Sequence, residues 1–327
     1  MLARVGAALL SLLFLPHGCF SDAAHQPVHL LHKAVGGKPQ LLALYEPWFG
    51  HPRHIQISYN SHDANVLRKQ VQKAKSMGIS GFVVDWYGNR DAFNDQTYAL
   101  MQTTAAKQNF KVAMLYDETD KEDSATDVAL ADFAMFRSTY LAADAAGREA
   151  YLTYEGRPVI FIFPKGNHTN WDRVRAELNK WNPAPILIQE NEPGKFPGAF
   201  DGYYAWISPG KQGWAADGSN WGEEYLDHFY STMTSKYQDK IHVGGIWASF
   251  DDSKASWGLN RNMAANCGQT FKNTSEIWRK YYAPDDPPPF LMIETWNDYE
   301  EGSAIEPGIP ACKPGTTEPI VHSGKLP

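Results

Sequence analysis

The chain has 327 residues, of which 43% are hydrophobic and 20% are charged, and this composition excludes a disordered protein. Its formal net charge of −7 argues against a nucleic-acid partner, because phosphates require a basic protein face. The 11 Trp and 16 Tyr residues instead favour a neutral ligand that can lie against aromatic rings.

The first 24 residues have the pattern of a secretory signal peptide. Arg4 supplies a positive start, the apolar stretch Val5–Leu15 follows, and small and polar residues continue to Ala24. The stretch is too short for a transmembrane span. Two kinds of processing remain open, which are simple cleavage at residues 21–24 and a lipid anchor on Cys19. Both predict export, to the medium, the periplasm or the cell surface.

From residue 41 onward, short apolar runs alternate with longer amphipathic segments. Most of the runs are almost continuously apolar, which is typical of strands buried on both faces of a parallel sheet. The predicted strands are Leu41–Tyr45, Gly81–Asp85, Lys111–Tyr116, Pro158–Phe163, Ile186–Gln189, Gly202–Trp206, Val243–Trp247 and Phe290–Thr295.

Helical segments lie between most of these strands. Asp63 is expected to cap the first helix, whose apolar residues recur at helical spacing until Gly78 ends it. The other predicted helices cover residues 94–108, 126–146, 171–181, 221–236 and 271–282.

Eight strands with intervening helices predict an α/β protein with one (β/α)8 barrel, over residues 38–310. The alternative is an open doubly wound sheet, which usually has a glycine-rich phosphate turn, and the sequence contains no GxGxxG. No eighth helix is recognisable after the last strand. Residues 311–327 are predicted to form a Pro- and Gly-rich tail.

Acidic and large aromatic residues recur where the predicted strands end. Loops after the C-terminal ends of the strands form the ligand site of such barrels. Sugars fit this pairing, because their C–H faces stack on aromatic rings and their hydroxyls need carboxylate or amide partners. The residues expected to bind a sugar are Glu46, Trp48, Asp85, Trp86, Tyr87, Glu118, Glu190, Tyr204, Trp206, Trp247, Asp251, Trp296 and Asn297.

Two alternatives to ligand contact remain open within this set. Each tryptophan taken alone could serve core packing instead, so the prediction depends on the repeated pairing of acids with aromatics. Asn297 could bind a substrate hydroxyl or hold its own loop. His51 and His54 likewise either contact the ligand or lie at the surface.

Two acids three residues apart, Asp298 and Glu301, follow the eighth strand and are the predicted catalytic pair. Cleavage of a glycosidic bond requires two carboxyl groups, one of them protonated. Mutual repulsion would raise one pKa and so give an acid and a base from similar groups. Glu300 and Glu306 are expected to face solvent or to hold the turn.

Other chemistries have little support in the sequence. HExxH, paired CxxC and GxSxG are absent, so neither a metal nor an organic cofactor is expected. The acidic run from Asp117 to Asp127 lacks the ligand spacing of an EF-hand and is predicted to be a solvated loop and helix start. Cys267 and Cys312 form a disulfide in one interpretation and remain unpaired thiols in the other.

Three motifs resemble those of glycoside hydrolase families 71 and 99. They are YEPWFG at Tyr45–Gly50, GFVVDWYG at Gly81–Gly88 and TWNDYEEGSAIEP at Thr295–Pro307. The resemblance implies a (β/α)8 enzyme in which Asp298 is the base and Glu301 the acid. Family 71 implies an inverting endo-α-1,3-glucanase. Family 99 implies a retaining endo-α-mannosidase that uses the 2-hydroxyl of its substrate.

The third motif is more similar to family 71, whereas the first two are more similar to family 99. The expected protein is therefore an exported, monomeric, endo-acting glycoside hydrolase for an α-1,3-glucan or an α-mannan. The alternative is a non-catalytic carbohydrate-binding or polysaccharide-assembly protein that uses the same cleft.

Overall fold

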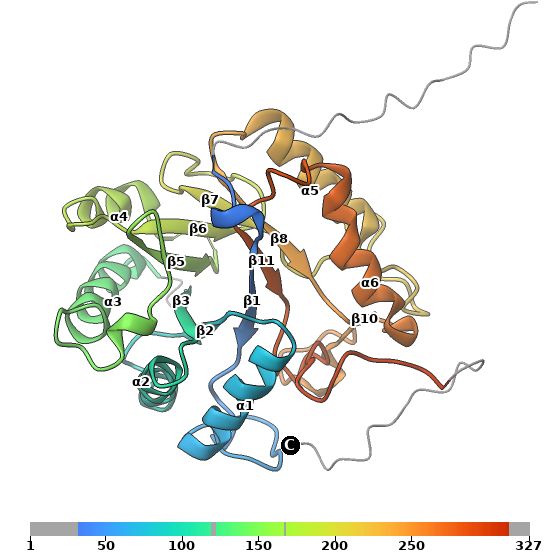
Figure 1. The fold of residues 1–327 in the computed structure, drawn as a ribbon, viewed down its shortest axis with the longest axis horizontal. Coiled ribbons are helices and arrows are strands. Elements are labelled where there is room, and N and C mark those ends of the chain that lie inside the picture. Colours follow the sequence, from blue (N-terminus) through green and yellow to red (C-terminus); the bar gives the residue numbers. More distant parts are fainter. Residues whose placement is uncertain (1–31, 119–121, 167, 314–327) are drawn as a thin grey trace, which may run out of the picture.

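The computed structural model describes residues 32–118, 122–166 and 168–313 (Figure 1). The predicted signal peptide, including Cys19, lies outside the described residues, as does residue 314 onward of the predicted tail. No helix within the described part of the chain combines the length and the apolar character that crossing a bilayer requires.

Eight parallel strands close into a barrel, as predicted. Each strand pairs in parallel with the next, and the last pairs with the first, so the sheet has no free edge and the open doubly wound alternative is wrong. The barrel strands are β1 (Gln40–Tyr45), β2 (Gly81–Trp86), β3 (Lys111–Asp117), β5 (Arg157–Phe163), β6 (Ile186–Glu190), β7 (Gly202–Tyr204), β8 (Ile241–Ile246) and β11 (Phe290–Ile293).

Helices surround the barrel on its outside (Figure 1). In the described residues the α-helices are α1 (Ala64–Ser76), α2 (Ala92–Ala106), α3 (Ala125–Tyr140), α4 (Trp171–Leu178), α5 (Glu223–Lys236) and α6 (Gln269–Glu276). Asp63 caps α1 as predicted, since its side chain accepts the N–H of Asn65 at 2.8 Å. Within the described chain, no α-helix lies between β6 and β7 or after β11.

Several short elements were not predicted. The strand β4 (Thr153–Tyr154) pairs antiparallel with β5, and β9 (Phe250–Asp251) pairs antiparallel with β10 (Asn262–Met263). Strands of two residues are too short to show any periodicity in a sequence. The predicted last helix is in fact α6 followed by the 3-10 helix η5 (Ile277–Lys280).

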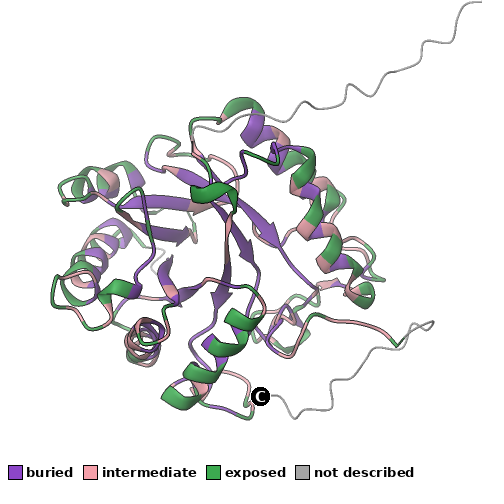
Figure 2. Ribbon diagram, in the orientation of Figure 1, coloured by how far each residue is buried: buried purple, intermediate pink, exposed green. Residues whose placement is uncertain are grey.

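Alternate residues of each strand serve two different cores. Leu42 and Leu44 of β1 pack inside the barrel with residues of the other strands, whereas Ala43 and Tyr45 pack outward against the helices. Figure 2 shows the strands as buried and the outer faces of the helices as exposed. Burial on both faces explains why the strand sequences are almost continuously apolar.

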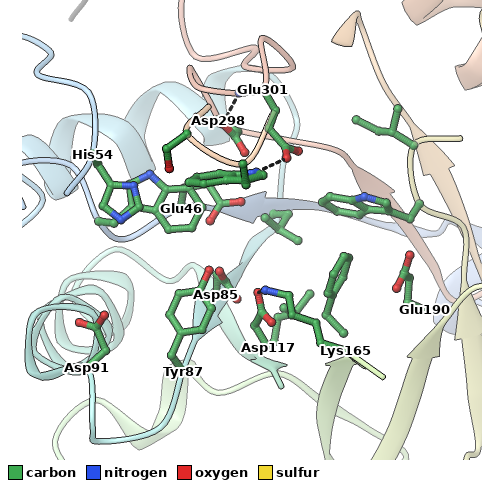
Figure 3. Close-up of a pocket in the computed structure, with 18 of the residues that line it drawn as sticks. Glu46, His54, Asp85, Tyr87, Asp91, Asp117, Lys165, Glu190, Asp298 and Glu301 are labelled. Atoms are coloured by element: carbon green, nitrogen blue, oxygen red, sulfur yellow. Dashed lines mark hydrogen bonds and ion pairs between the residues drawn. The ribbon is translucent and has the colours of Figure 1, made fainter. Parts of the chain in front are cut away.

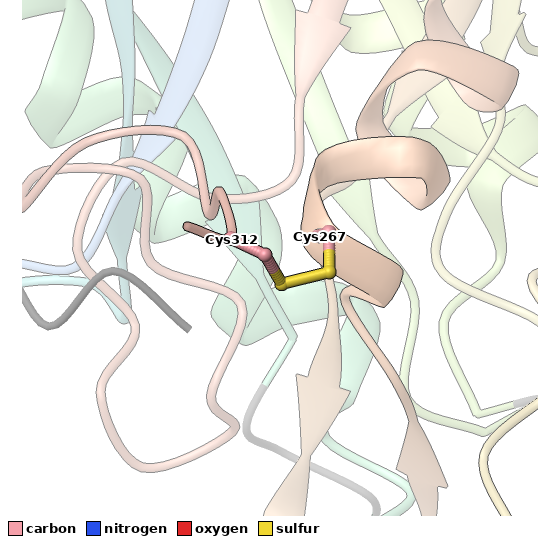
Figure 4. Close-up of a disulfide and its surroundings, with 2 residues drawn as sticks. All are labelled: Cys267 and Cys312. Carbon is pink, nitrogen blue, oxygen red and sulfur yellow. A yellow bond between two sulfur atoms is a disulfide. The ribbon is translucent and has the colours of Figure 1, made fainter. Parts of the chain in front are cut away.

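A disulfide between Cys267 and Cys312 attaches the segment after β11 to the start of α6 (Figure 4). Cys267 lies in the short 3-10 helix η4 (Asn266–Gly268), which directly precedes α6. The interpretation in which Cys267 and Cys312 form a disulfide is confirmed, and the interpretation as two unpaired thiols is wrong.

Candidate active site

A cavity of about 820 Å³ lies at the C-terminal ends of the barrel strands. Each of the eight strands supplies a lining side chain from its last residues or from the loop that follows it. Of the residues predicted from the sequence, those that line the cavity are Glu46, Trp48, Asp85, Tyr87, Glu190, Trp206, Asp298 and Glu301. Figure 3 shows Asp298 and Glu301 on one side of this cavity, with Asp85, Asp117 and Lys165 on the other.

The turn after β11 holds Asp298 and Glu301 together. One oxygen of Asp298, Oδ1, accepts the backbone N–H groups of Glu300 at 2.9 Å and Glu301 at 2.8 Å. The N–H of Asp298 donates to the hydroxyl of Thr295 at 2.8 Å. Burial raises the pKa of Asp298 well above its ordinary value, and the nearby Glu301 raises it further.

Glu301 is partly buried at the mouth of the cavity. Its Oε1 accepts the indole N–H of Trp257 at 2.8 Å. Burial raises the pKa of Glu301, while the Trp257 hydrogen bond and the charge of Arg261 oppose the rise. The two carboxyl groups therefore share a site in which full ionisation of both is unfavourable.

Glu46 and Asp85 also line the cavity, and each has a carboxyl oxygen without a hydrogen-bond partner among the described residues. Glu46 follows β1 and is 4% exposed, and its Oε2 has no partner. Asp85 in β2 is 3% exposed, and its Oδ1 has none. Burial raises the pKa of both, with Asp85 adding to the effect on Glu46 and Asp117 adding to that on Asp85. Such atoms can bind the hydroxyls of a ligand.

Asp117 and Lys165 form an ion pair in the cavity wall, with Nζ 2.6 Å from Oδ2. Burial by itself would lower the pKa of Lys165, but Asp117 and other carboxylates raise it above its ordinary value. The prediction that Asp117 begins a solvated loop is wrong, because Asp117 ends β3 and is 6% exposed. Its apolar predecessors in the strand were the signal that could have placed it.

Some cavity residues had no signal in the sequence. Lys165, Arg53, Trp257 and Arg261 line the cavity from loops whose course depends on tertiary contacts. Within the described residues, no group of three or more His, Cys, Asp or Glu side chains is arranged to hold a metal ion.

Seven predicted sugar contacts lie outside the cavity. They are Trp86, Glu118, Tyr204, Trp247, Asp251, Trp296 and Asn297. Trp86 points outward because its neighbour Asp85 points inward, and successive side chains of a strand face opposite sides. Its indole N–H donates to Asp95 at 2.9 Å.

The other aromatic residues of this group are core residues. Trp296 is fully buried and packs on Phe82 with ring centroids 5.3 Å apart. Trp247 is fully buried and donates its indole N–H to the carbonyl of Trp221 at 3.0 Å. Tyr204 faces the barrel interior below the cavity. Core packing, which was the open alternative for each tryptophan, describes these positions.

Two acidic residues of the group have structural contacts. Glu118 is 1% exposed and accepts hydrogen bonds from the Thr169 hydroxyl and the Lys165 N–H. Asp251 is exposed and accepts the N–H of Ser253 at 3.1 Å, which caps the short helix η3 (Asp252–Lys254).

Asn297 holds the loop after β11 to the loop after β1. Its Oδ1 accepts the N–H of Glu46 at 2.7 Å, and its Nδ2 donates to the Glu46 carbonyl at 2.9 Å and to the Tyr59 hydroxyl at 3.2 Å. Of its two open roles, the structure shows loop holding.

Glu300 and Glu306 are both buried, so they hold the turn and do not face solvent. Glu306 accepts the side chains of Gln70, Tyr59 and Tyr299 at 2.8–3.0 Å. Glu300 pairs with His54 Nδ1 at 2.7 Å. His54 lines the cavity and stacks on the Trp48 ring at 4.6 Å, whereas His51 does not line it.

A (β/α)8 barrel whose mouth carries a carboxyl pair among aromatic rings has the architecture of a barrel glycoside hydrolase. The chain belongs to glycosyl hydrolase family 71, whose family model matches residues 53–315. It is therefore a glycoside hydrolase, with a carbohydrate as its substrate. No curated protein sequence matches the chain.

Three solved structures have the same fold at low sequence identity. Two are of the GH99 endo-alpha-mannosidase from Bacteroides thetaiotaomicron. One is 15% identical with a TM-score of 0.65, covering 84% of this chain and 89% of that chain. The other is 14% identical with a TM-score of 0.64, covering 86% and 91%. A glycoside hydrolase-like protein is 13% identical with a TM-score of 0.61, covering 88% and 90%. The predicted resemblance to families 71 and 99 is confirmed.

Proposed function

We propose that the protein is an exported, endo-acting hydrolase of an α-linked glycan, either an α-1,3-glucan or an α-mannan. Membership of family 71 supports the α-glucan, and the shared fold with an endo-alpha-mannosidase supports the α-mannan. The observation that carries the catalytic assignment is that Asp298 and Glu301 lie side by side on the cavity wall, directly after β11.

Glu301 is the proposed acid and Asp298 the proposed base. Burial raises the pKa of both carboxyl groups, and the charge of Glu301 raises that of Asp298 further. Burial raises the pKa of Asp298 more strongly than that of Glu301, although two backbone N–H groups on Asp298 favour its ionised form, so the two roles rest on the resemblance to families 71 and 99. Glu301 then gives its proton to the leaving oxygen as the glycosidic C–O bond breaks. Asp298 removes a proton either from the attacking water or from the substrate's 2-hydroxyl.

A digestion panel tests the substrate and the stereochemistry together. The purified protein is incubated with α-1,3-glucan and with α-mannan, and proton NMR records which anomer forms first. Attack by water gives inversion, whereas participation of the 2-hydroxyl gives retention. If no polymer in the panel is cleaved but one binds and raises the melting temperature, the protein is a carbohydrate-binding barrel and the proposal is wrong.

Substitution of the two acids tests their roles. Asp298→Asn and Glu301→Gln are each expected to lower kcat by about 100-fold or more, with a nearly unchanged melting temperature. Asp172→Asn is the matched control, because Asp172 lies on α4 and does not line the cavity. Full activity in either catalytic variant would remove that residue from the mechanism.

Export is supported by the N-terminal pattern and by the Cys267–Cys312 disulfide, since disulfides persist in oxidising compartments. Fractionation of the native host, followed by mass spectrometry of the N-terminal peptide, tests this part. A start at residues 21–24 indicates cleavage, whereas a lipidated Cys19 indicates an anchor. An intact Met1 on a cytoplasmic protein would contradict export.

A further inference from the structure

Trp257 is a large apolar side chain that remains exposed at the mouth of the cavity. It is 44% exposed, and it lies on the loop between β9 and β10. Its ring meets Trp48 and His54 edge-on, at centroid distances of 6.1 and 6.2 Å. Trp257 therefore lines the cavity together with the rings of Trp48 and His54, and it lies on the same side of the cavity as Glu301.

The loop that carries Trp257 is closed by buried polar contacts. Asp252 is fully buried and accepts the N–H of Leu259 at 3.0 Å, the N–H of Arg261 at 2.7 Å and the Nε of Arg261 at 2.6 Å. A Cβ at Gly258 would lie 1.8 Å from the Asp252 carbonyl oxygen, so only glycine fits there. These contacts fix the loop and hence the position of the indole.

The same hairpin is attached to the turn that carries Glu301. The N–H of Asp251 donates to the Glu301 carbonyl at 2.7 Å, and the hydroxyl of Ser249 donates to the Gly302 carbonyl at 2.7 Å. The indole N–H of Trp257 adds the hydrogen bond to Glu301 Oε1 at 2.8 Å. Backbone and side chain of Glu301 are thus both held from one loop.

We propose that Trp257 positions the acid and also binds substrate: its N–H occupies Oε1 of Glu301, and its exposed ring face stacks the sugar on the leaving-group side. An indole N–H can only donate and is best accepted by the carbonyl oxygen of a protonated carboxyl group, so Oε1 of Glu301 is its carbonyl oxygen and Oε2 carries the proton. The acid donates its proton to the leaving oxygen, and Trp257 contacts that acid, so we place its ring on the leaving-group side of the bond. This inference rests on the proposed acid role of Glu301.

The pH dependence of activity tests the hydrogen bond. The N–H favours the carboxylate form of Glu301, so its removal raises the pKa of the acid. In Trp257→Phe the basic limb of the kcat/KM profile is expected to move up by about one pH unit. The charged groups that face Glu301 stay in place, namely Asp298, Glu46, Asp252, Arg261 and Lys165.

Substitution of the indole by benzothiophene at residue 257 keeps the ring shape and removes only the N–H. The same upward shift is expected, with KM little changed, and this variant decides the question if Trp257→Phe does not fold. Trp257→Ala removes both the indole N–H and the ring surface on which the sugar is proposed to stack. It is expected to lower kcat/KM for the polymer about tenfold more than for an aryl glycoside, which has no sugar on the leaving-group side.

Trp214→Phe is the matched control. Trp214 packs on Phe250 of the same hairpin with ring centroids 5.0 Å apart, but it does not line the cavity. The pH profile of kcat/KM of Trp214→Phe should match that of the wild type. An unchanged basic limb in both N–H-deleting proteins would overturn the inference, while loss of activity in Glu301→Gln would still support the acid role. If Glu301→Gln is fully active, the proposed function itself fails.

Discussion

Asn297 shows how one side chain can hold the site together without touching its ligand. Its amide satisfies both the N–H and the carbonyl of Glu46, and it donates to the Tyr59 hydroxyl. All of these groups are buried. A buried polar group that loses its partner costs about 1–3 kcal/mol.

Asn297→Ala is therefore expected to lower the free energy of unfolding by about 2–4 kcal/mol, because it removes partners from two buried backbone groups. Urea denaturation of the wild type and the variant measures this change. Asn65→Ala is the control, since Asn65 is exposed on α1, and it should stay within about 0.5 kcal/mol of the wild type. Equal effects of the two substitutions would contradict the assigned role.

Single residues also show how far sequence reasoning reaches. Asp298 and Glu301 could be placed at the cavity because they directly follow a recognisable strand. Asp85 and Trp86 are adjacent, and the sequence could not decide which of them points inward, since both faces of the strand are buried. Trp257 could not be predicted, because its position depends on how the Asp252–Arg261 contacts fold an irregular loop back over the cavity.

At the scale of elements, the eight barrel strands could be predicted to within about two residues, because their apolar runs are long and bounded. The helix ends could be predicted less closely, since the helix predicted over residues 126–146 ends at Tyr140. The β9–β10 hairpin could not be predicted, because strands of two residues show no periodicity in the sequence. Its loop nevertheless lines the cavity.

The Trp257 loop depends on Gly258. In Gly258→Ala the new Cβ would meet the Asp252 carbonyl oxygen at 1.8 Å, so the backbone must move and the indole must leave Glu301. We expect kcat/KM to fall by about tenfold or more, and the melting temperature to fall as well because the buried Asp252 contacts beside Gly258 are disturbed, as measured by steady-state kinetics and thermal denaturation. Gly194→Ala, where a Cβ meets no atom within 4 Å, is the control. Equal kinetics in both would argue against a fixed loop.

The disulfide links the short helix η4 to the segment after β11, and its two cysteines are 45 positions apart in sequence. Replacing Cys267 and Cys312 together by Ser is expected to lower the free energy of unfolding by about 2–4 kcal/mol, mainly because the unfolded chain gains freedom. Thermal denaturation with and without reductant measures this. The reduced wild type should have the same melting temperature as the double variant, and the melting temperature of the double variant should not change when reductant is added. No difference between oxidised and reduced wild type would show that the bridge adds nothing to stability.

At the scale of the whole molecule, the barrel mouth concentrates buried carboxyl groups whose pKa values are raised. Burial raises the pKa of Glu190 from 4.5 to about 7, and burial also raises that of the neighbouring Glu294, which is fully buried. A carboxyl group with a raised pKa binds protons more tightly in the folded state than in the unfolded state. Its contribution to stability is full below its unfolded pKa and is lost as pH rises through its folded pKa.

The free energy of unfolding should therefore fall between pH 5 and pH 8. Glu190→Gln should remove part of this slope, at most about 3 kcal/mol over the range, because 2.5 pKa units correspond to that energy. Urea denaturation at four pH values measures both proteins. Glu177→Gln, at an exposed position of α4, should keep the wild-type slope. The prediction would be contradicted if the free energy of unfolding had the same pH dependence in the wild type and in Glu190→Gln.

The pairing of β11 with β1 has a consequence for the order of events during folding. This pairing is the seam of the barrel, and its neighbours Glu46 and Asn297 are 251 positions apart along the chain. Both proposed catalytic acids follow β11 directly, so a chain that has assembled only its earlier strands has most of a cavity wall and no acid pair. Contacts between such distant segments form slowly. The rate at which hydrolytic activity returns during refolding should therefore report the pairing of β11 with β1. We expect activity to return more slowly than the change in fluorescence that accompanies burial of the tryptophans in the earlier strands.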